Sequence, residues 1–162
     1  MTISKGFAKI DRLYLEDLYP GQRFTSESYT IKEEDIKVFA KEFDPQPFHL
    51  DEEAAQRSVF AGLAASGWHT AAITMRLQVE TGLPLVGGIV GAGGEISWPR
   101  PTRPGDQLHV ESEVLEVTPS RSRPDRGLVV VRSETLNERG EVVQIFTGKV
   151  VVPRRPVTTE EQ

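Results

Sequence analysis

The second half of the chain alternates apolar and polar residues over four long segments. These segments are 88–98, 107–118, 127–137 and 141–152. Alternation of this kind, with many β-branched residues, is typical of strands that bury one face. The short polar segment Asn137–Gly140 predicts a hairpin turn between the last two strands. An earlier strand is predicted over 22–31, after the Pro20-Gly21 turn.

Helical spacing of apolar residues dominates the region before these strands. Apolar residues recur at this spacing from Ile36 to Phe43, which predicts a helix. Thr30 and Glu33 have the spacing of a capping box at its start. The helix is expected to end at Asp44, because Pro45 follows and the residue before a proline disfavours helical geometry.

Two further helices are expected before the run of strands. Asp51 and the two glutamates after it predict the cap and first turn of a short helix that ends near Arg57. The segment 64–81 has apolar residues on two faces, so a helix buried on both faces is expected there. The order of elements predicts an α+β fold, in which an antiparallel sheet wraps around a long central helix. We expect a single domain over 1–162, with a core at about 22–152 and a loose polar tail at 153–162.

Composition and charge narrow the class of protein. The chain has 162 residues, of which 38% are hydrophobic and 27% are charged, as in ordinary folded soluble proteins. A net charge of −5 and a pI near 5.3 argue against a nucleic-acid partner. No apolar run has the length of a membrane span, and the first residues lack the apolar middle of a signal peptide. A cytoplasmic protein without a membrane partner is therefore expected.

The chain contains no cysteine, which excludes disulfides, thiolate nucleophiles and thiolate metal sites. Its three histidines, at 49, 69 and 109, form no pair at metal-binding spacing, so no metal site is expected. We interpret His69 and His109 as packing or surface residues. Catalysis would then depend on carboxylate, imidazole or backbone groups.

The segment FDPQPFHLD, residues 43–51, contains the most specific candidate chemistry. It places Asp44 and His49 five residues apart, with Pro45 and Pro47 between them. Prolines fix the backbone, so the segment reads as a stiffened loop that holds the two side chains at a set separation. If the loop curves back, the pair can share one water. A carboxylate that accepts from the imidazole orients the ring and favours its charged form. Which of the two takes the proton stays open.

The start of the predicted central helix is a second candidate. Ser66 has the position of an N-cap, which leaves the Gly67 N–H among the free donors at the positive end of the helix. Such a donor can receive an oxygen on which negative charge develops. Glycine at this position also permits close approach of a ligand to the backbone.

The longer stretch FDPQPFHLDEEAAQRSVFAGLAASG resembles the (R)-specific enoyl-CoA hydratase signature of the MaoC-like hot-dog proteins. The family pattern is D-x-N-P-x-H-x-D, followed by a spacer and a glycine that opens the central helix. The likeness continues through IVGAGGEISWPRPTRPGD and spans about 22–152. Gln46 stands where the family usually has asparagine. Residues that match the pattern in order are Asp44, Pro47, His49, Asp51 and Gly67.

This resemblance implies a hot-dog fold and reversible hydration of a trans-2-enoyl-CoA to an (R)-3-hydroxyacyl-CoA. It implies no cofactor, since the coenzyme A thioester is the substrate, and it implies a homodimer or a dimer of dimers. Asp44 and His49 are then the catalytic pair. The implied oxyanion and substrate-binding residues are Gly67, Ser66, Gln46 and Trp68.

Two other functions remain open at this point. A hot-dog acyl-CoA thioesterase usually has an acidic helper on the central helix, where Glu80 is far from the start. A non-catalytic acyl-CoA binding module is suggested by the replacement at Gln46. Arg100, Arg103 and the run at 120–126 could meet coenzyme A phosphates, but we prefer to interpret them as solvated turns.

Overall fold

The sheet of the protein is antiparallel and has the strand order β1-β4-β5-β6-β3, with β2 paired to β4 beside β1. It is seen in a computed structural model, which describes residues 11–158. The four long strands match the predicted segments to within two residues. The strands are β1 Arg23–Thr25, β2 Tyr29–Thr30, β3 Val90–Ser97, β4 Gln107–Pro119, β5 Arg126–Leu136 and β6 Val142–Pro153.

The predicted hairpin between β5 and β6 is confirmed. The Gly140 N–H donates to the Asn137 carbonyl, and the Asn137 N–H donates to the Glu141 carbonyl, both at 3.0 Å. Gly140 has a φ of +74°, a left-handed conformation that favours glycine. This turn sets the register in which β5 and β6 pair along their lengths.

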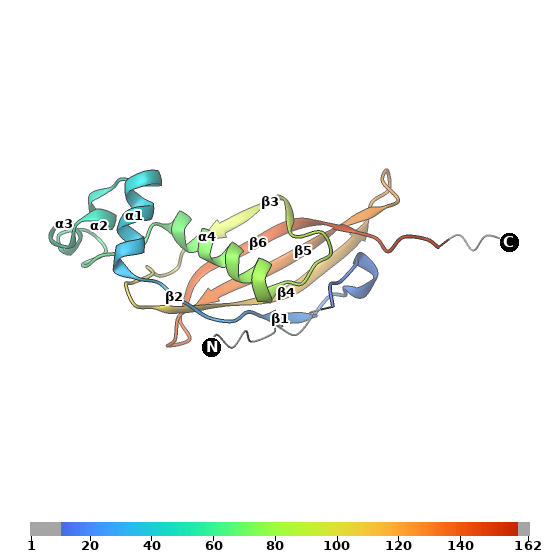
Figure 1. Cartoon of the computed structure of the whole chain (residues 1–162), viewed down its shortest axis with the longest axis horizontal. Coiled ribbons are helices and arrows are strands. Elements are labelled where there is room, and N and C mark those ends of the chain that lie inside the picture. Colours follow the sequence, from blue (N-terminus) through green and yellow to red (C-terminus); the bar gives the residue numbers. More distant parts are fainter. Residues whose placement is uncertain (1–10, 159–162) are drawn as a thin grey trace, which may run out of the picture.

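One helix lies along a face of the sheet, and three other helices gather at one end (Figure 1). The helix on the sheet is α4, and a π-helical turn, Gln78–Gly82, continues it. This is the expected arrangement of a sheet wrapped around a central helix. The helices are α1 Glu33–Phe43, α2 Pro47–Leu50, α3 Glu52–Gln56 and α4 Gly67–Leu77, and a 3₁₀ turn covers Leu15–Asp17.

The strand predicted over 22–31 is wrong as a single element, because it is interrupted between β1 and β2. At the interruption the Ser26 hydroxyl accepts from the Val110 N–H at 2.8 Å, while the Ser26 N–H donates to the Val110 carbonyl at 2.9 Å. The Ser26 hydroxyl therefore takes the place of a backbone carbonyl as the partner of the Val110 N–H. Alternation alone does not reveal such a substitution.

The predicted capping box at the start of α1 is also wrong. Lys32 is the N-cap and its side chain makes no capping bond. Thr30 lies in β2 opposite Gln107, so the strand holds it away from the helix start. The helix does end at Phe43 with Asp44 as its C-cap, as predicted from Pro45.

The central helical segment, α4 with its π-helical continuation, covers 67–82, and only one of its apolar faces is buried. Ile73 and Leu77 are 5% and 3% exposed and pack toward the sheet. On the other face Met75 and Val79 are 43% and 45% exposed. A single sheet covers only one side of a helix, so the second apolar face has no cover among residues 11–158.

Both ends of the ordered core extend beyond expectation. Leu15 and Leu18 are buried in the core that lies under β4, β5 and β6, although the predicted core began at 22. Arg154 and Arg155 form ion pairs with Glu16 and Asp17 at 3.0 and 2.7 Å. The first part of the predicted loose tail is therefore anchored, and 159–162 lie outside the described residues.

Candidate active site

The stiffened segment brings Asp44 and His49 together. Asp44 caps the end of α1, and His49 lies in α2. Pro47 occupies the first turn of α2, where a missing N–H costs nothing, so the expected loop contains a short helix. The chain curves back as required, and His49 Nε2 lies 3.3 Å from Asp44 Oδ2.

The imidazole of His49 is held from its other side. Nδ1 lies 2.6 Å from the carbonyl oxygen of Ala64, so Nδ1 carries the hydrogen and donates it. The residue is only 4% exposed. In the neutral ring Nε2 is therefore an acceptor, and it is directed at the Asp44 carboxylate.

The Asp44 carboxylate is ionised in its surroundings. Gln46 Nε2 donates to Asp44 Oδ1 at 2.6 Å. Burial raises the pKa of Asp44, but hydrogen bonds from Ser66 and Gln46 oppose it and, with His49 in its charged form, hold the pKa below its usual value. Asp44 is thus a hydrogen-bond acceptor beside His49 Nε2.

The start of α4 offers a free backbone donor. Ser66 is the N-cap, as predicted, and its Oγ accepts from the Trp68 N–H at 3.3 Å. Within the part of the chain that the structure describes, no acceptor takes the Gly67 N–H. This donor lies at the positive end of an eleven-residue helix.

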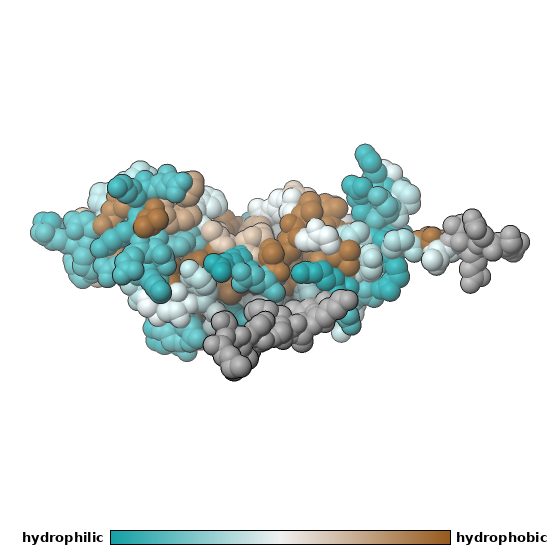
Figure 2. Space-filling view, viewed as in Figure 1, coloured by the Kyte–Doolittle hydropathy of each residue, from teal (hydrophilic) through white to brown (hydrophobic). Residues whose placement is uncertain are grey.

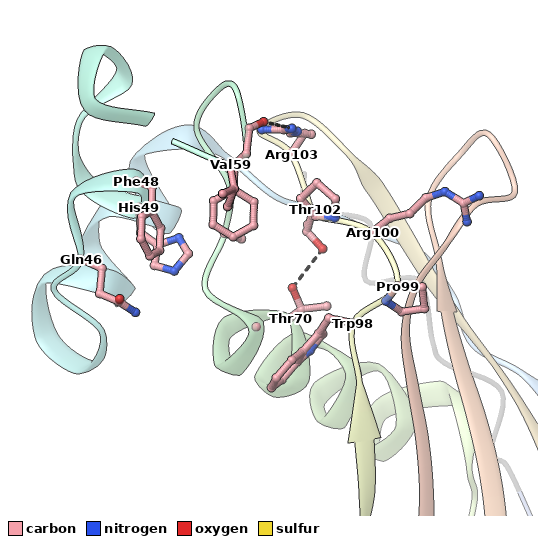
Figure 3. Close-up of a pocket in the computed structure, with 14 residues that line it drawn as sticks. Gln46, Phe48, His49, Val59, Thr70, Trp98, Pro99, Arg100, Thr102 and Arg103 are labelled. Carbon is pink, nitrogen blue, oxygen red and sulfur yellow. Dashed lines mark hydrogen bonds between the residues drawn. The ribbon is translucent and has the colours of Figure 1, made fainter. Parts of the chain in front are cut away.

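A cavity of about 650 Å³ connects these groups and is of the size that small-molecule ligands occupy. Figure 3 shows Gln46, Phe48 and His49 along one wall, with Thr70 and Trp98 on another. The cavity is lined by Gln46, Phe48, His49, Val59, Phe60, Ala65, Gly67, Thr70 and the whole of Trp98–Arg103.

The predicted site residues separate into two groups. Gln46, His49 and Gly67 line the cavity, and Asp44 adjoins it through His49. Ser66 is fully buried behind the wall, where it caps α4. Trp68 is not among the residues that line the cavity. It is one residue beyond Gly67 on the helix, so it points to a different side and is 60% exposed.

Trp98 lines the cavity instead, and sequence reasoning missed it. A Cβ built on Gly67 would lie 2.6 Å from the Trp98 ring, so only glycine admits the indole there. Trp68 packs edge-to-face on this ring, with centroids 5.3 Å apart. The indole N–H donates to Gln144 Oε1 at 3.0 Å. The only sequence signal was an aromatic residue at the end of a strand, next to a proline.

Arg103 was also missed, since a solvated turn was expected. Its guanidinium instead donates to the carbonyls of Gly62 and Leu63 at 2.9 and 3.2 Å, and to the carbonyl of Phe60. Arg100 has a half-exposed side chain that pairs with Glu141 at 3.4 Å. The two arginines of the cavity rim therefore differ in what they contact.

The remaining candidates lie away from the cavity. His69 is buried, as expected of a packing residue, and stacks on Phe39 with ring centroids 4.6 Å apart; burial lowers its pKa. Glu80 forms a surface ion pair with Arg76 at 3.0 Å. Across residues 11–158 no group of three or more His, Asp or Glu side chains is arranged to hold a metal ion. Nor does any helix in that range have the length and apolar character needed to cross a membrane.

Comparison with known proteins identifies the family. The family model described as the MaoC like domain matches residues 18–137. The chain belongs to the MaoC-like family. A crystal structure of a MaoC-like dehydratase from Rhodospirillum rubrum has 68% sequence identity and a TM-score of 0.88, with 90% of this chain and 99% of that chain covered. The hot-dog fold of this MaoC-like protein is thereby confirmed.

Two other relatives place this MaoC-like protein near hydratases. The (R)-specific enoyl-CoA hydratase of Rhodospirillum rubrum is 32% identical over 143 residues, which are 88% of this chain and 93% of the relative. The (R)-hydratase PhaJ1 of Pseudomonas aeruginosa has 27% identity and a TM-score of 0.70, with 93% and 92% of the two chains covered. The uncharacterized protein YdeM of Bacillus subtilis is 36% identical over 141 residues, covering 85% of this chain and 96% of YdeM.

Proposed function

We propose that this MaoC-like protein adds water reversibly to a trans-2-enoyl-CoA and forms an (R)-3-hydroxyacyl-CoA. Relatives named (R)-specific enoyl-CoA hydratase and 3-hydroxybutyryl-CoA dehydratase support hydratase or dehydratase chemistry for the family. The finer proposal is carried by one observation. His49 Nε2 lies 3.3 Å from an ionised Asp44 carboxylate beside a cavity that Gly67 also lines.

Two acceptors that converge on one point are suited to binding a water. With Nδ1 donating to Ala64, the neutral His49 ring accepts at Nε2, and the Asp44 carboxylate accepts at Oδ2. A water bound beside the pair, on the cavity side, would donate one hydrogen to each and direct its oxygen lone pair into the cavity. This orientation suits attack on C3 of the enoyl group.

Proton transfer in this arrangement favours His49 as the base. When the water oxygen bonds to C3, Nε2 takes one proton, and the resulting imidazolium lies against the Asp44 carboxylate. The electron pair of the C2–C3 double bond moves toward the thioester oxygen, giving an enolate. Return of the proton from Nε2 to C2 completes the addition, and the reverse sequence is dehydration.

The negative charge of the enolate needs a donor. The Gly67 N–H, at the positive end of α4, would donate to the thioester oxygen. Loss of one such donor typically costs enzymes about 100-fold or more in kcat. No cofactor takes part in the proposed reaction.

The thioesterase alternative is less well supported. Glu80, its acidic candidate on the central helix, is outside the set of lining residues and pairs with Arg76 at the surface. The binding-module alternative began from Gln46, which here donates to Asp44 Oδ1 and so supports the carboxylate rather than removing it. Both observations favour the hydratase.

One optical experiment separates the three functions. Crotonyl-CoA is incubated with the protein while the enoyl-thioester absorbance and free thiol are followed together. A hydratase removes the absorbance without releasing thiol, which is the result we expect. Thiol release would indicate a thioesterase, and no change in either signal would indicate a binding module.

We also propose that the protein is a homodimer. Trp68 and Met75 in α4 and Val79 in its π-helical continuation expose an apolar face, and β3 is an edge strand with Val90 half exposed. Apolar surface on this side of the molecule is visible in Figure 2. Edge strands and apolar helix faces both favour a partner. Light scattering should give twice the chain mass of 18.0 kDa, and a mass near 18.0 kDa would reject the dimer.

A further inference from the structure

Arg103 joins two parts of the chain that are far apart in sequence. It lies between β3 and β4, and its guanidinium reaches the loop at 58–66 (Figure 3). Nη1 donates to Gly62 and Leu63, and Nη2 donates to Phe60, so three backbone carbonyls share one side chain. The planar guanidinium presents its donors in fixed directions, which a lysine ammonium cannot reproduce.

The loop that Arg103 holds is otherwise supported by scattered backbone bonds, such as those from Gly62 N–H to the Ala55 carbonyl and from Ala65 N–H to the Thr102 carbonyl. It belongs to no helix or strand. Ala61 has a φ of +50°, and Gly62 has a φ of +152°. A left-handed conformation is unfavourable for alanine and persists when surrounding contacts impose it. The guanidinium supplies such contacts on both sides of Ala61.

The same loop carries groups of the proposed active site. The Ala64 carbonyl, which accepts from His49 Nδ1, follows directly after Leu63, whose carbonyl accepts from Arg103. The Ser66 hydroxyl, two residues further on, supports the Asp44 carboxylate. A shift of the loop would thus move the acceptor that fixes the His49 ring and the donor that holds Asp44.

We propose that Arg103 is a positioning residue for this site. By binding the carbonyls of Phe60, Gly62 and Leu63, it fixes the Ala64 carbonyl and so sets the orientation and the tautomer of His49. This inference rests on the proposed function, in which His49 is the base. A displacement of about 1 Å in a catalytic group costs roughly 100-fold in rate, so the effect should appear in kcat.

The competing role for Arg103 is to bind a phosphate of coenzyme A. Its terminal nitrogens already donate to backbone carbonyls, which leaves few donors for an anion. Arg100, on the same rim, has a side chain that is 54% exposed, and its ion pair with Glu141 is a weak surface contact. Arg100 is therefore the better candidate for a phosphate, and the two arginines should respond differently to the nucleotide part of the substrate.

Kinetics with two substrates distinguishes positioning from phosphate binding. Crotonyl-CoA is compared with crotonyl-pantetheine, which lacks the nucleotide phosphates. Arg103→Ala and Arg103→Lys should lower kcat by about 100-fold for both substrates with little change in KM. Free guanidinium at millimolar concentration should restore part of kcat to Arg103→Ala. Arg100→Ala should raise KM for crotonyl-CoA alone.

Arg57→Ala is the matched control, because Arg57 lies beside the same loop but forms an exposed ion pair with Glu53. It should keep wild-type kcat and show no response to guanidinium. Wild-type kcat in Arg103→Ala, or a loss confined to KM for crotonyl-CoA, would overturn the positioning role.

NMR of the His49 ring tests the inference without turnover. The Nδ1–H that donates to Ala64 should give a slowly exchanging signal in the wild type and in Arg57→Ala. This signal should weaken or shift in Arg103→Lys. That variant keeps the positive charge, so it can be measured even if Arg103→Ala fails to fold. An unchanged signal in Arg103→Lys would refute the inference. A wild type that does not hydrate crotonyl-CoA would instead refute the proposed function, while the NMR result still decides the role of Arg103.

Discussion

The contacts that hold the sheet differ in kind from those that hold the helical segment at 33–66. β4, β5 and β6 pair through long backbone ladders above a core of buried aliphatic residues. The helical segment also contributes to a buried aliphatic cluster, but it has no backbone ladder, and individual bonds place its polar atoms. Among these are the bond from Ala65 N–H to the Thr102 carbonyl at 2.9 Å, and the bonds made by the Arg103 guanidinium.

This difference separates stability from chemistry. A ladder averages over many equivalent bonds, so the sheet supplies a rigid frame. Individual side-chain bonds fix single atoms, and these are the atoms of the proposed site: the Ala64 carbonyl, His49 Nε2 and Asp44 Oδ2. Substitutions in the two regions should therefore affect activity and unfolding to different extents.

The largest effect is expected in the helical segment, at His49. Replacing the base should lower kcat for crotonyl-CoA hydration by about 100-fold to 10,000-fold. His49→Gln is the more informative variant. Its amide can still donate to the Ala64 carbonyl, so that buried carbonyl keeps a hydrogen-bond partner. Thermal unfolding should stay close to wild type. A variant that folds and keeps more than about a tenth of wild-type kcat would remove His49 from the mechanism.

The matched substitution in the sheet is Val129→Ala. Val129 is 1% exposed in the core beneath β5, so its truncation should cost about 2 kcal/mol of unfolding free energy. Because the site is held by other contacts, kcat should remain within about twofold of wild type. Urea unfolding and hydration rates measured on the same samples check both parts. A kcat that falls as steeply as the stability would argue that the two regions are coupled.

A smaller effect with a pH signature is expected at Ser66. Ser66→Ala removes the N-cap of α4, at a cost of about 1 kcal/mol, and removes a donor that lowers the pKa of Asp44. The Asp44 carboxyl group acts as the required hydrogen-bond acceptor when it is ionised. A raised pKa therefore moves the acidic limb of the kcat/KM profile to higher pH.

The effect of Ser66→Ala on the pH dependence of unfolding follows from the same lowered pKa of Asp44. A lowered pKa in the folded state stabilises the protein above the unfolded value of 3.8, and this contribution is lost as the pH falls through the folded value. Ser66→Ala should reduce that contribution. Ser58→Ala is the control, because the Ser58 hydroxyl donates to Ala55 and does not approach Asp44. An acidic limb that stays in place in Ser66→Ala would separate Ser66 from Asp44.

The sequence predicted those parts of the molecule that depend on local or periodic signals. Alternation located the strands, because one face of the sheet is buried. The Pro45 signal ended α1 at Asp44, and the cap at Ser66 marked the start of α4. The pairing of Asp44 with His49 was predictable because they are only five positions apart in the sequence.

Contacts between distant segments were not predictable in this way. Nothing near Gly67 in the sequence indicates that the Trp98 ring packs against its backbone. An arginine between prolines has the composition of a solvated turn, yet Arg103 binds a loop some forty residues earlier. The exposed face of α4 and its π-helical continuation, with Met75 and Val79, shows the same limit, because an apolar pattern indicates burial but does not identify what covers it.

The central claim is that Asp44 and His49 act as one unit on one water. A double-mutant cycle with Asp44→Asn, His49→Gln and the double variant tests it most directly, with kcat/KM for crotonyl-CoA hydration as the readout. Because either substitution disrupts the shared water, the double variant should be about as slow as the slower single variant. Single losses that multiply in the double variant would mean that the two residues act independently, and would contradict the account.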